Sequence, residues 1–288
     1  MFTDSKILIY RAVTPLHCGA TESGDGIDRP VVRERYTNFP FIPATSLKGV
    51  WRNICQRSKN NTCNEKWDDA EVTAAFGPDS EKADKNGAGL LGFVDAQVLY
   101  IPVRASARTF FIITCPLQLS RFNETLAKQE IKPFKITDID DNTIKSSALA
   151  AINEVYLEDI KLKAESEELN LPSYGVPDYL KSRLALVSDE TFEWFASNAM
   201  EIRAHNKLSK TKQSDNLWYE EFVPAESIFF GQLLESPPYK EDNSAIPGQY
   251  SAKIMKTKPQ LFQVGGNEST GHGLMEITPI EKGESHGE

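Results

Sequence analysis

Apolar residues along the chain predict a succession of short β-strands with a few amphipathic helices between them. The runs rich in β-branched and aromatic residues lie at 6–14, 98–102, 108–115, 184–187, 218–224 and 227–234, and two more apolar runs lie within 261–277. Strands and helices alternate irregularly, without the regular β-α-β series of a doubly wound sheet. The pattern therefore predicts an α+β fold.

Two segments carry the spacing of a helix that packs on a sheet. In the first, apolar side chains recur at positions i, i+3, i+4 and i+7: Leu47, Val50, Trp51 and Ile54. Thr45 or Ser46 is expected to cap it. Lys48 and Arg52 lie four residues apart on another face. The second helix, 189–200, has its apolar side at Phe192, Phe195, Ala196 and Ala199, and 123–128 is helix-prone.

Four polar segments interrupt these elements. Residues 15–42 contain three glycines and three prolines and predict a long ordered loop. Residues 60–88 are rich in charge and predict an inserted, partly helical subdomain. Residues 203–217 have four basic residues and little to bury, which fits a protruding hairpin or a mobile loop. Residues 280–288 are expected to form a frayed tail.

Length and composition favour one large domain. The chain has 288 residues, of which 40% are hydrophobic, enough to bury a substantial core. It has no run of eighteen apolar residues, and its first residues lack the layout of a secretory signal, so a cytoplasmic protein without a membrane partner is expected. Its four cysteines lack zinc-ligand spacing and are expected to be reduced and mostly buried.

Positive charge is concentrated near the start of an otherwise acidic chain. Between positions 28 and 59 there are seven Lys or Arg residues and two acids, whereas the whole chain has a net charge of −9. Such asymmetry indicates a localised anion-binding face. Arg33, Arg35, Lys48 and Arg52 are predicted to contact phosphates near the start of the first helix. The alternative is an ordinary solvated helix face.

The glycine-rich stretch 265–273 lies between two apolar runs. It lacks the lysine of a phosphate-binding loop, and no helix-opening dinucleotide fingerprint is present. One interpretation is a loop between strands where Gly265, Gly266, Gly271 and Gly273 let an RNA backbone lie against exposed amides. The other is a tight turn.

Five motifs resemble a known family. They are DRPVVRE at 28–34, FPFIPATSLKG at 39–49, LGFVDA at 91–96, WYEEFVP at 218–224 and GGNESTGHG at 265–273. In this order they resemble the RAMP superfamily of CRISPR proteins, and most of all the repeated backbone subunit of the type III-B (Cmr) effector complex. The resemblance runs from the first strand to the glycine-rich loop, and is loose over 130–175.

The resemblance implies a fold and a set of partners. The fold is a single domain over 1–288, with an RRM-like, ferredoxin-like palm, an inserted finger at 60–88 and a β-hairpin thumb at 203–217. Copies would stack head to tail along a CRISPR guide RNA beside other Cmr subunits. They would cleave complementary single-stranded target RNA at regular intervals, as a metal-dependent endoribonuclease using Mg²⁺ or Mn²⁺.

The resemblance also implies site residues. Asp28 matches the catalytic aspartate, which would also hold the metal, and His17 matches a histidine near it. Glu220 or Glu221 matches a supporting carboxylate, and the choice between them is open. The RNA-binding set then includes the basic and motif residues Arg29, Ser46, Arg203 and Lys207. Phe222 is a departure, because tyrosine often stands there.

Other interpretations of these residues and of the whole chain stay open. Asp28 could be a loop acid paired with Arg29, and His17 a hydrogen-bonded structural residue. The chain could be an inert filament subunit that only binds guide RNA. A third possibility is a stand-alone endonuclease that processes the precursor guide transcript.

Overall fold

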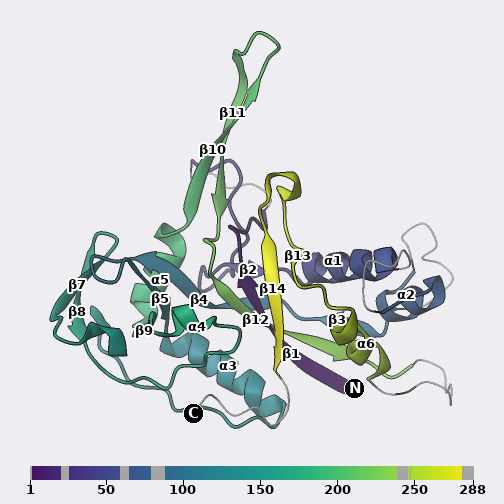
Figure 1. Cartoon of the computed structure of the whole chain (residues 1–288), viewed down its shortest axis with the longest axis horizontal. Helices are drawn as coiled ribbons and strands as arrows, with labels where there is room; N and C mark the ends of the chain where they lie inside the picture. Colours follow the sequence, from purple (N-terminus) through teal and green to yellow (C-terminus); the bar gives the residue numbers. More distant parts are fainter. Residues whose placement is uncertain are drawn as a thin grey trace.

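A long mixed sheet forms the body of the molecule, and a two-stranded hairpin rises from it (Figure 1). The computed structural model describes residues 2–20, 26–58, 65–78, 88–238, 246 and 248–280. Much of the expected finger at 60–88 and nearly all of the tail at 280–288 therefore lie outside the described residues.

The strands are β1 (Asp4–Ala12), β2 (Phe41–Ile42), β3 (Leu91–Phe93), β4 (Ala96–Arg104), β5 (Phe110–Thr114), β6 (Thr143–Lys145), β7 (Glu154–Leu157), β8 (Ile160–Glu165), β9 (Leu184–Val187), β10 (Glu201–Leu208), β11 (Ser214–Phe222), β12 (Ile228–Glu235), β13 (Phe262–Gln263) and β14 (Leu274–Ile280). The helices are α1 (Ala44–Arg57), α2 (Asp69–Phe76), α3 (Pro116–Lys128), α4 (Asp178–Lys181), α5 (Asp189–Asn198) and α6 (Gln249–Thr257), with single 3₁₀ turns at Ser147–Leu149 and Glu268–Thr270.

The main sheet has the order β13-β14-β1-β12-β4-β5-β9-β6-β8-β7, with β2 on β4 and β3 on β12. Its centre is antiparallel: β1 pairs with β12 and β14, and β12 with β4. Parallel pairs occur at β5 with β9 and at β6 with β8. The predicted α+β class is confirmed. Strands β6, β7 and β8 were not predicted, because they are short and lie in a highly charged segment.

Both faces of the sheet are buried, as β1 illustrates. Leu8 and Tyr10 belong to one core cluster, which includes Trp51 of α1 and Phe195 of α5. The intervening Ile7 and Ile9 belong to a second cluster with residues of α3. Because side chains alternate along a strand, two-sided burial requires the continuous apolar run seen in the sequence.

Helix α1 begins earlier than predicted, and its cap comes from elsewhere in the chain. Pro43 occupies the cap position, and no side chain there caps the helix, so the expected cap by Thr45 or Ser46 is wrong. Both residues lie inside the first turn. The backbone N–H of Ala44 donates instead to Asp95 Oδ1 at 2.7 Å. Asp95 therefore satisfies one of the orphan donors of this helix.

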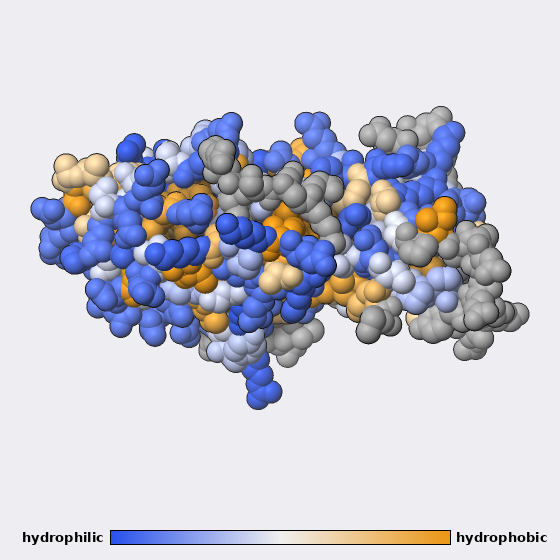
Figure 2. Space-filling view, turned by 90° about the horizontal axis from the view of Figure 1, so that it is seen from below, coloured by the Kyte–Doolittle hydropathy of each residue, from blue (hydrophilic) through white to orange (hydrophobic). Residues whose placement is uncertain are grey.

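The lower face of the molecule is mostly polar. Figure 2 shows apolar atoms there as separate areas between hydrophilic side chains. In the described ranges, no helix combines the length and apolar character needed to cross a bilayer.

Candidate functional site

The loop that carries Asp28 lies along the base of the hairpin and joins it by an isolated parallel bridge between Arg29 and Glu220. Arg29 N–H donates to Tyr219 O at 3.1 Å, and Glu221 N–H donates to Arg29 O at 3.0 Å. The backbone N–H of Tyr219 also donates to Asp28 Oδ2 at 2.8 Å. Since Asp28 is exposed, its carboxylate is fixed at one oxygen and open to solvent.

Asp28 is not paired with the neighbouring arginine. Arg29 Nη1 contacts Glu220 Oε1 at 2.6 Å, and no ion pair joins Asp28 to any described residue. The alternative of an Asp28–Arg29 ion pair is therefore wrong. The chain turns the two side chains to different partners, which leaves an exposed carboxylate beside a fixed cation.

Glu220 is a buried junction of three segments, with 1% of its surface exposed. It accepts hydrogen bonds from Arg29 Nη1 at 2.6 Å, Trp218 Nε1 at 2.8 Å and Asn267 Nδ2 at 2.6 Å, and His205 Nε2 lies 3.5 Å away. Burial alone would raise the pKa of this carboxyl, but the hydrogen bonds from Trp218, Asn267 and Arg29 lower it below its ordinary value. Glu220 therefore joins the Asp28 loop, the hairpin and the glycine-rich loop as an anion.

Glu221 is also buried, but its carboxylate contacts a different segment. Its carboxylate accepts from Arg33 Nη2 at 2.5 Å and from Val31 N–H at 2.9 Å. Arg33 also donates to Ala196 O at 2.7 Å and to Asn38 O at 2.9 Å. The predicted phosphate contact of Arg33 is contradicted, because internal acceptors take its donors and only 15% of its side chain is exposed.

His17 is buried at the foot of the same hairpin. Its Nδ1 lies 2.7 Å from Glu221 O, so Nδ1 carries the proton and donates. Its ring lies 5.4 Å from that of Phe222, and a Cβ added to Gly19 would lie 2.8 Å from Nε2. These contacts favour the structural alternative for His17, which braces the surrounding backbone.

The glycine-rich loop is a tight turn whose amides are largely used internally. Gly266 N–H donates to His17 O, Gly271 N–H to Glu268 O and Gly273 N–H to Pro15 O, at 2.8 to 3.0 Å. A Cβ on Gly265 would lie 2.2 Å from His17 O, and Gly265 has φ +79°. The expectation that Gly266, Gly271 and Gly273 offer free amides to RNA is wrong. Close backbone packing explains Gly265.

Arg203 is held at the opposite strand of the hairpin base. It contacts Glu201 Oε2 at 2.6 Å and His272 Nε2 at 2.8 Å, and its Cζ lies 5.4 Å from the centre of the Phe222 ring. Burial, reinforced by the charge of Arg203, lowers the pKa of His272, so this imidazole is a neutral acceptor. Arg203 keeps 41% of its side chain exposed, and Lys207 is exposed further along β10.

Comparison with known proteins identifies the family of this chain. A family model described as the RAMP superfamily matches residues 9–276. The chain belongs to the RAMP superfamily. It is 30% identical to the CRISPR system Cmr endoribonuclease Cmr4 of Pyrococcus furiosus, with 92% of each chain covered.

Two solved RAMP structures have the same fold. The crystal structure of oligomeric Cmr4 from Pyrococcus furiosus superposes with a TM-score of 0.70 at 24% identity, covering 96% of this chain and 97% of that one. A chain of the type III-B Cmr-beta complex bound to cognate target RNA superposes with a TM-score of 0.76 at 19% identity, covering 96% of this chain and 98% of that one. The long sheet with its few helices is thus the RAMP fold.

The predicted basic face of this RAMP protein lies on α1. Lys48 is partly buried and forms no ion pair with a described residue. Burial and then the nearby charge of Arg52 lower the pKa of Lys48. Arg35 is exposed at the turn before β2, and Ser46 is partly exposed in the first turn of α1. An anion bound here would relieve the repulsion between Lys48 and Arg52.

Sequence reasoning missed Trp218, Asn267 and His272, which fix the hairpin base. All three lie inside the motifs 218–224 and 265–273. Membership of these motifs was the one signal that could have marked them as site residues. Their partners lie far away in sequence, as with Asn267 and Glu220, and no local pattern reveals such pairs.

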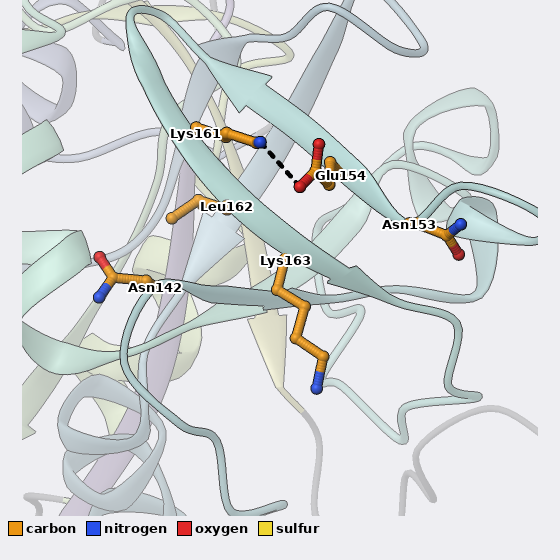
Figure 3. A pocket seen from close by; sticks show the side chains of 6 residues that line it. All are labelled: Asn142, Asn153, Glu154, Lys161, Leu162 and Lys163. Carbon is orange, nitrogen blue, oxygen red and sulfur yellow. Dashed lines mark ion pairs between the residues drawn. The ribbon is translucent and has the colours of Figure 1, made fainter.

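A cavity of about 660 Å³ lies at the other end of the sheet, between β6, β8 and β7 (Figure 3). Lys161 in it pairs with Glu154 at 2.7 Å, and Lys163 pairs with Glu165 at 2.6 Å. Its cations are thus already neutralised, and none of the predicted site residues lines it. The cavity is not a part of the candidate site.

Proposed function

We propose that this chain is the repeated backbone subunit of a type III-B CRISPR effector complex, which binds guide RNA and cleaves complementary target RNA through Asp28. The observation that carries the proposal is the exposed Asp28 carboxylate, fixed by the Tyr219 N–H at the base of a protruding hairpin. The relative named Cmr endoribonuclease Cmr4 supports the activity. The solved oligomeric Cmr4 and the Cmr-beta complex with target RNA support the partners: further copies, other Cmr subunits and RNA.

Cleavage through the 2′-hydroxyl of RNA needs that oxygen deprotonated and aligned with the phosphorus. Asp28 can accept the proton at its open oxygen. Glu220 and Glu221 act behind it, as buried anions that hold Arg29 and Arg33 and so fix the backbone of residues 28–33. The proposal therefore gives both carboxylates a positioning role, and their contacts with Arg29 and Arg33 support it.

A divalent ion, Mg²⁺ or Mn²⁺, is part of the proposal. Mg²⁺ commonly takes one or two carboxylates together with phosphate oxygens and waters. Among the described residues no three His, Cys, Asp or Glu side chains gather as a ready-made site. Asp28 would therefore hold the ion jointly with RNA oxygens, and the ion would supply charge stabilisation at the scissile phosphate.

Basic side chains that are exposed or partly exposed would bind the RNA backbones. Arg35, Lys48 and Arg52, with Ser46, would contact the guide near α1, and Arg203 and Lys207 would follow the strand beside the hairpin, the proposed thumb. Base pairing with the guide would read the target sequence, so the protein needs contacts only to backbone and shape. We place the assembly in the cytoplasm, since the thiols of Cys18 and Cys115 are free and buried, as in proteins of reducing compartments.

The test is Asp28→Ala in the guide-loaded assembly. The variant should assemble and retain guide RNA as the wild type does, while cleavage at regularly spaced target positions falls by at least about 100-fold. Asp178→Ala is the matched control, because Asp178 is an exposed acid on α4 that pairs with Lys181.

The same experiment separates the rivals. An inert filament subunit would bind guide but leave target intact even as wild type. A stand-alone processing enzyme would cut precursor transcript as a monomer. Normal target cleavage by Asp28→Ala would refute the assignment of the site.

A further inference from the structure

Arg29 has an exposed side chain whose guanidinium is nevertheless held in place. Its side chain is 58% exposed, yet Nη1 contacts the buried Glu220 at 2.6 Å and Cζ lies 5.2 Å from the centre of the Trp218 ring. Its backbone N–H and C=O are both bonded to β11. An exposed arginine usually samples many rotamers, whereas this one is held at its backbone and its tip.

The guanidinium of Arg29 still has donors to offer. Arginine carries five N–H groups in a planar fork, and among the described residues Arg29 donates side-chain hydrogen bonds only to Glu220, through Nη1. Arg33 differs, because Glu221, Ala196 and Asn38 take its donors. Arg203 differs too, because Glu201 and His272 engage both of its terminal nitrogens and Nε. With respect to the described residues, Arg29 is thus a positioned cation with unused donors.

Its location gives those donors a target. Arg29 follows Asp28 directly, and consecutive residues of β11, Tyr219 and Glu220, hold the Asp28 carboxylate and the Arg29 guanidinium. A phosphate that brings its neighbouring 2′-hydroxyl to Asp28 would lie beside a planar fork suited to bidentate contact with two phosphate oxygens.

We propose that Arg29 is a further catalytic residue, which binds the non-bridging oxygens of the scissile phosphate and stabilises the charge that grows on them. The inference rests on the proposed function. In the step, the 2′-oxygen forms a bond to phosphorus and loses its proton to the base, while the bond from phosphorus to the 5′-oxygen breaks and that oxygen takes a proton from water. Arg29 neither gains nor loses a proton.

Glu220 gives Arg29 its catalytic value. A cation that is already oriented stabilises a transition state without paying reorganisation at the moment of reaction. The ionised Glu220, itself fixed by Trp218 and Asn267, provides that orientation.

The first test measures single-turnover cleavage by guide-loaded particles that carry Arg29→Ala, Arg29→Lys or the control Arg104→Ala. Arg104 is an exposed arginine at the end of β4 that pairs with Glu158. Arg29→Ala should slow cleavage by about 100- to 1,000-fold, the range for losing one preorganised donor group. Arg29→Lys should recover only part of the rate, because lysine lacks the fork. Affinity for a target with 2′-deoxyribose at the cleavage position should change by less than about fivefold, and Arg104→Ala should cut normally.

The second test replaces one non-bridging oxygen of the scissile phosphate by sulfur. One diastereomer should slow the wild type more than it slows Arg29→Ala, because the variant has already lost the contact that sulfur weakens. A merely structural role for Arg29 would leave the sulfur effect unchanged, which would overturn the proposal. If Arg29→Ala fails to assemble, Arg29→Lys gives the decision: wild-type rate and wild-type sulfur effect in that variant would overturn it.

Failure of this inference is distinguishable from failure of the proposed function. Full activity of Arg29→Ala together with an inactive Asp28→Ala would remove Arg29 alone. Full activity of both variants would remove the site itself.

Discussion

The base of the hairpin and the basic face of α1 are both rich in charged residues, but they differ in how those charges are paired. At the hairpin base, Arg29 and Arg33 are paired with the buried Glu220 and Glu221. On α1, Lys48 has no counter-ion among the described residues, and burial and Arg52 lower its pKa. Paired charges fix geometry, whereas uncompensated ones attract a partner. The first region is suited to positioning and the second to binding.

The largest expected effect lies at the hairpin base. Glu221→Ala should lower the free energy of unfolding by about 3–5 kcal/mol, because it leaves Arg33 buried without its anion. Denaturant unfolding of the purified chain measures it. Glu154→Ala is the control, since it breaks an exposed pair with Lys161 and should leave the free energy of unfolding nearly unchanged. A Glu221→Ala cost as small as the control would mean that the two regions do not differ.

Charge reversal on α1 should affect binding and leave folding nearly intact. Lys48→Glu with Arg52→Glu should weaken guide retention by more than about tenfold and reduce the salt dependence, with the slope of log K against log salt falling by about 1 to 2. Filter binding across a salt series gives both numbers. Unchanged retention would remove α1 from the proposed RNA surface.

The lowered pKa of Lys48 predicts a pH dependence. The folded protein disfavours the charged form, so this unfavourable contribution to stability is fully present below the lowered pKa and disappears as pH rises from the lowered pKa to the ordinary lysine pKa. A bound phosphate favours the charged form. Guide retention should therefore weaken at alkaline pH before an ordinary lysine would lose its proton, and Lys48→Arg should abolish the effect. An identical pH profile in Lys48→Arg would contradict it.

The smallest effect concerns the start of α1, which presents the basic face. Asp95→Ala should lower the free energy of unfolding by about 1 kcal/mol, since it removes the cap on Ala44 N–H. Ser46→Ala should change it by less than about 0.5 kcal/mol, because Ser46 does not cap the helix. Equal effects at the two positions would favour the cap predicted from sequence.

Periodic apolar patterns predicted the fold where an element buries a full face. The run at 6–14 became β1, and the spacing of Phe192 and Phe195 became α5. The predicted cap of α1 was wrong because the helix begins earlier, after a proline, and because a residue 51 positions away supplies the acceptor. The expectation of free amides in the glycine-rich loop failed because backbone carbonyls accept these N–H groups, and two of the acceptors, His17 O and Pro15 O, are far away in sequence. The motifs marked Asp28, Glu220 and Glu221 as candidates, but only the fold reveals that Arg29 pairs with Glu220 and not with Asp28.

The most direct test of the central claim is to purify the native assembly and size its RNA. If the basic face of α1 binds a guide while the hairpin base positions a cutting carboxylate, the particle should contain several copies of this chain and a short RNA of defined length that high salt releases. A particle that contains no nucleic acid would contradict the account.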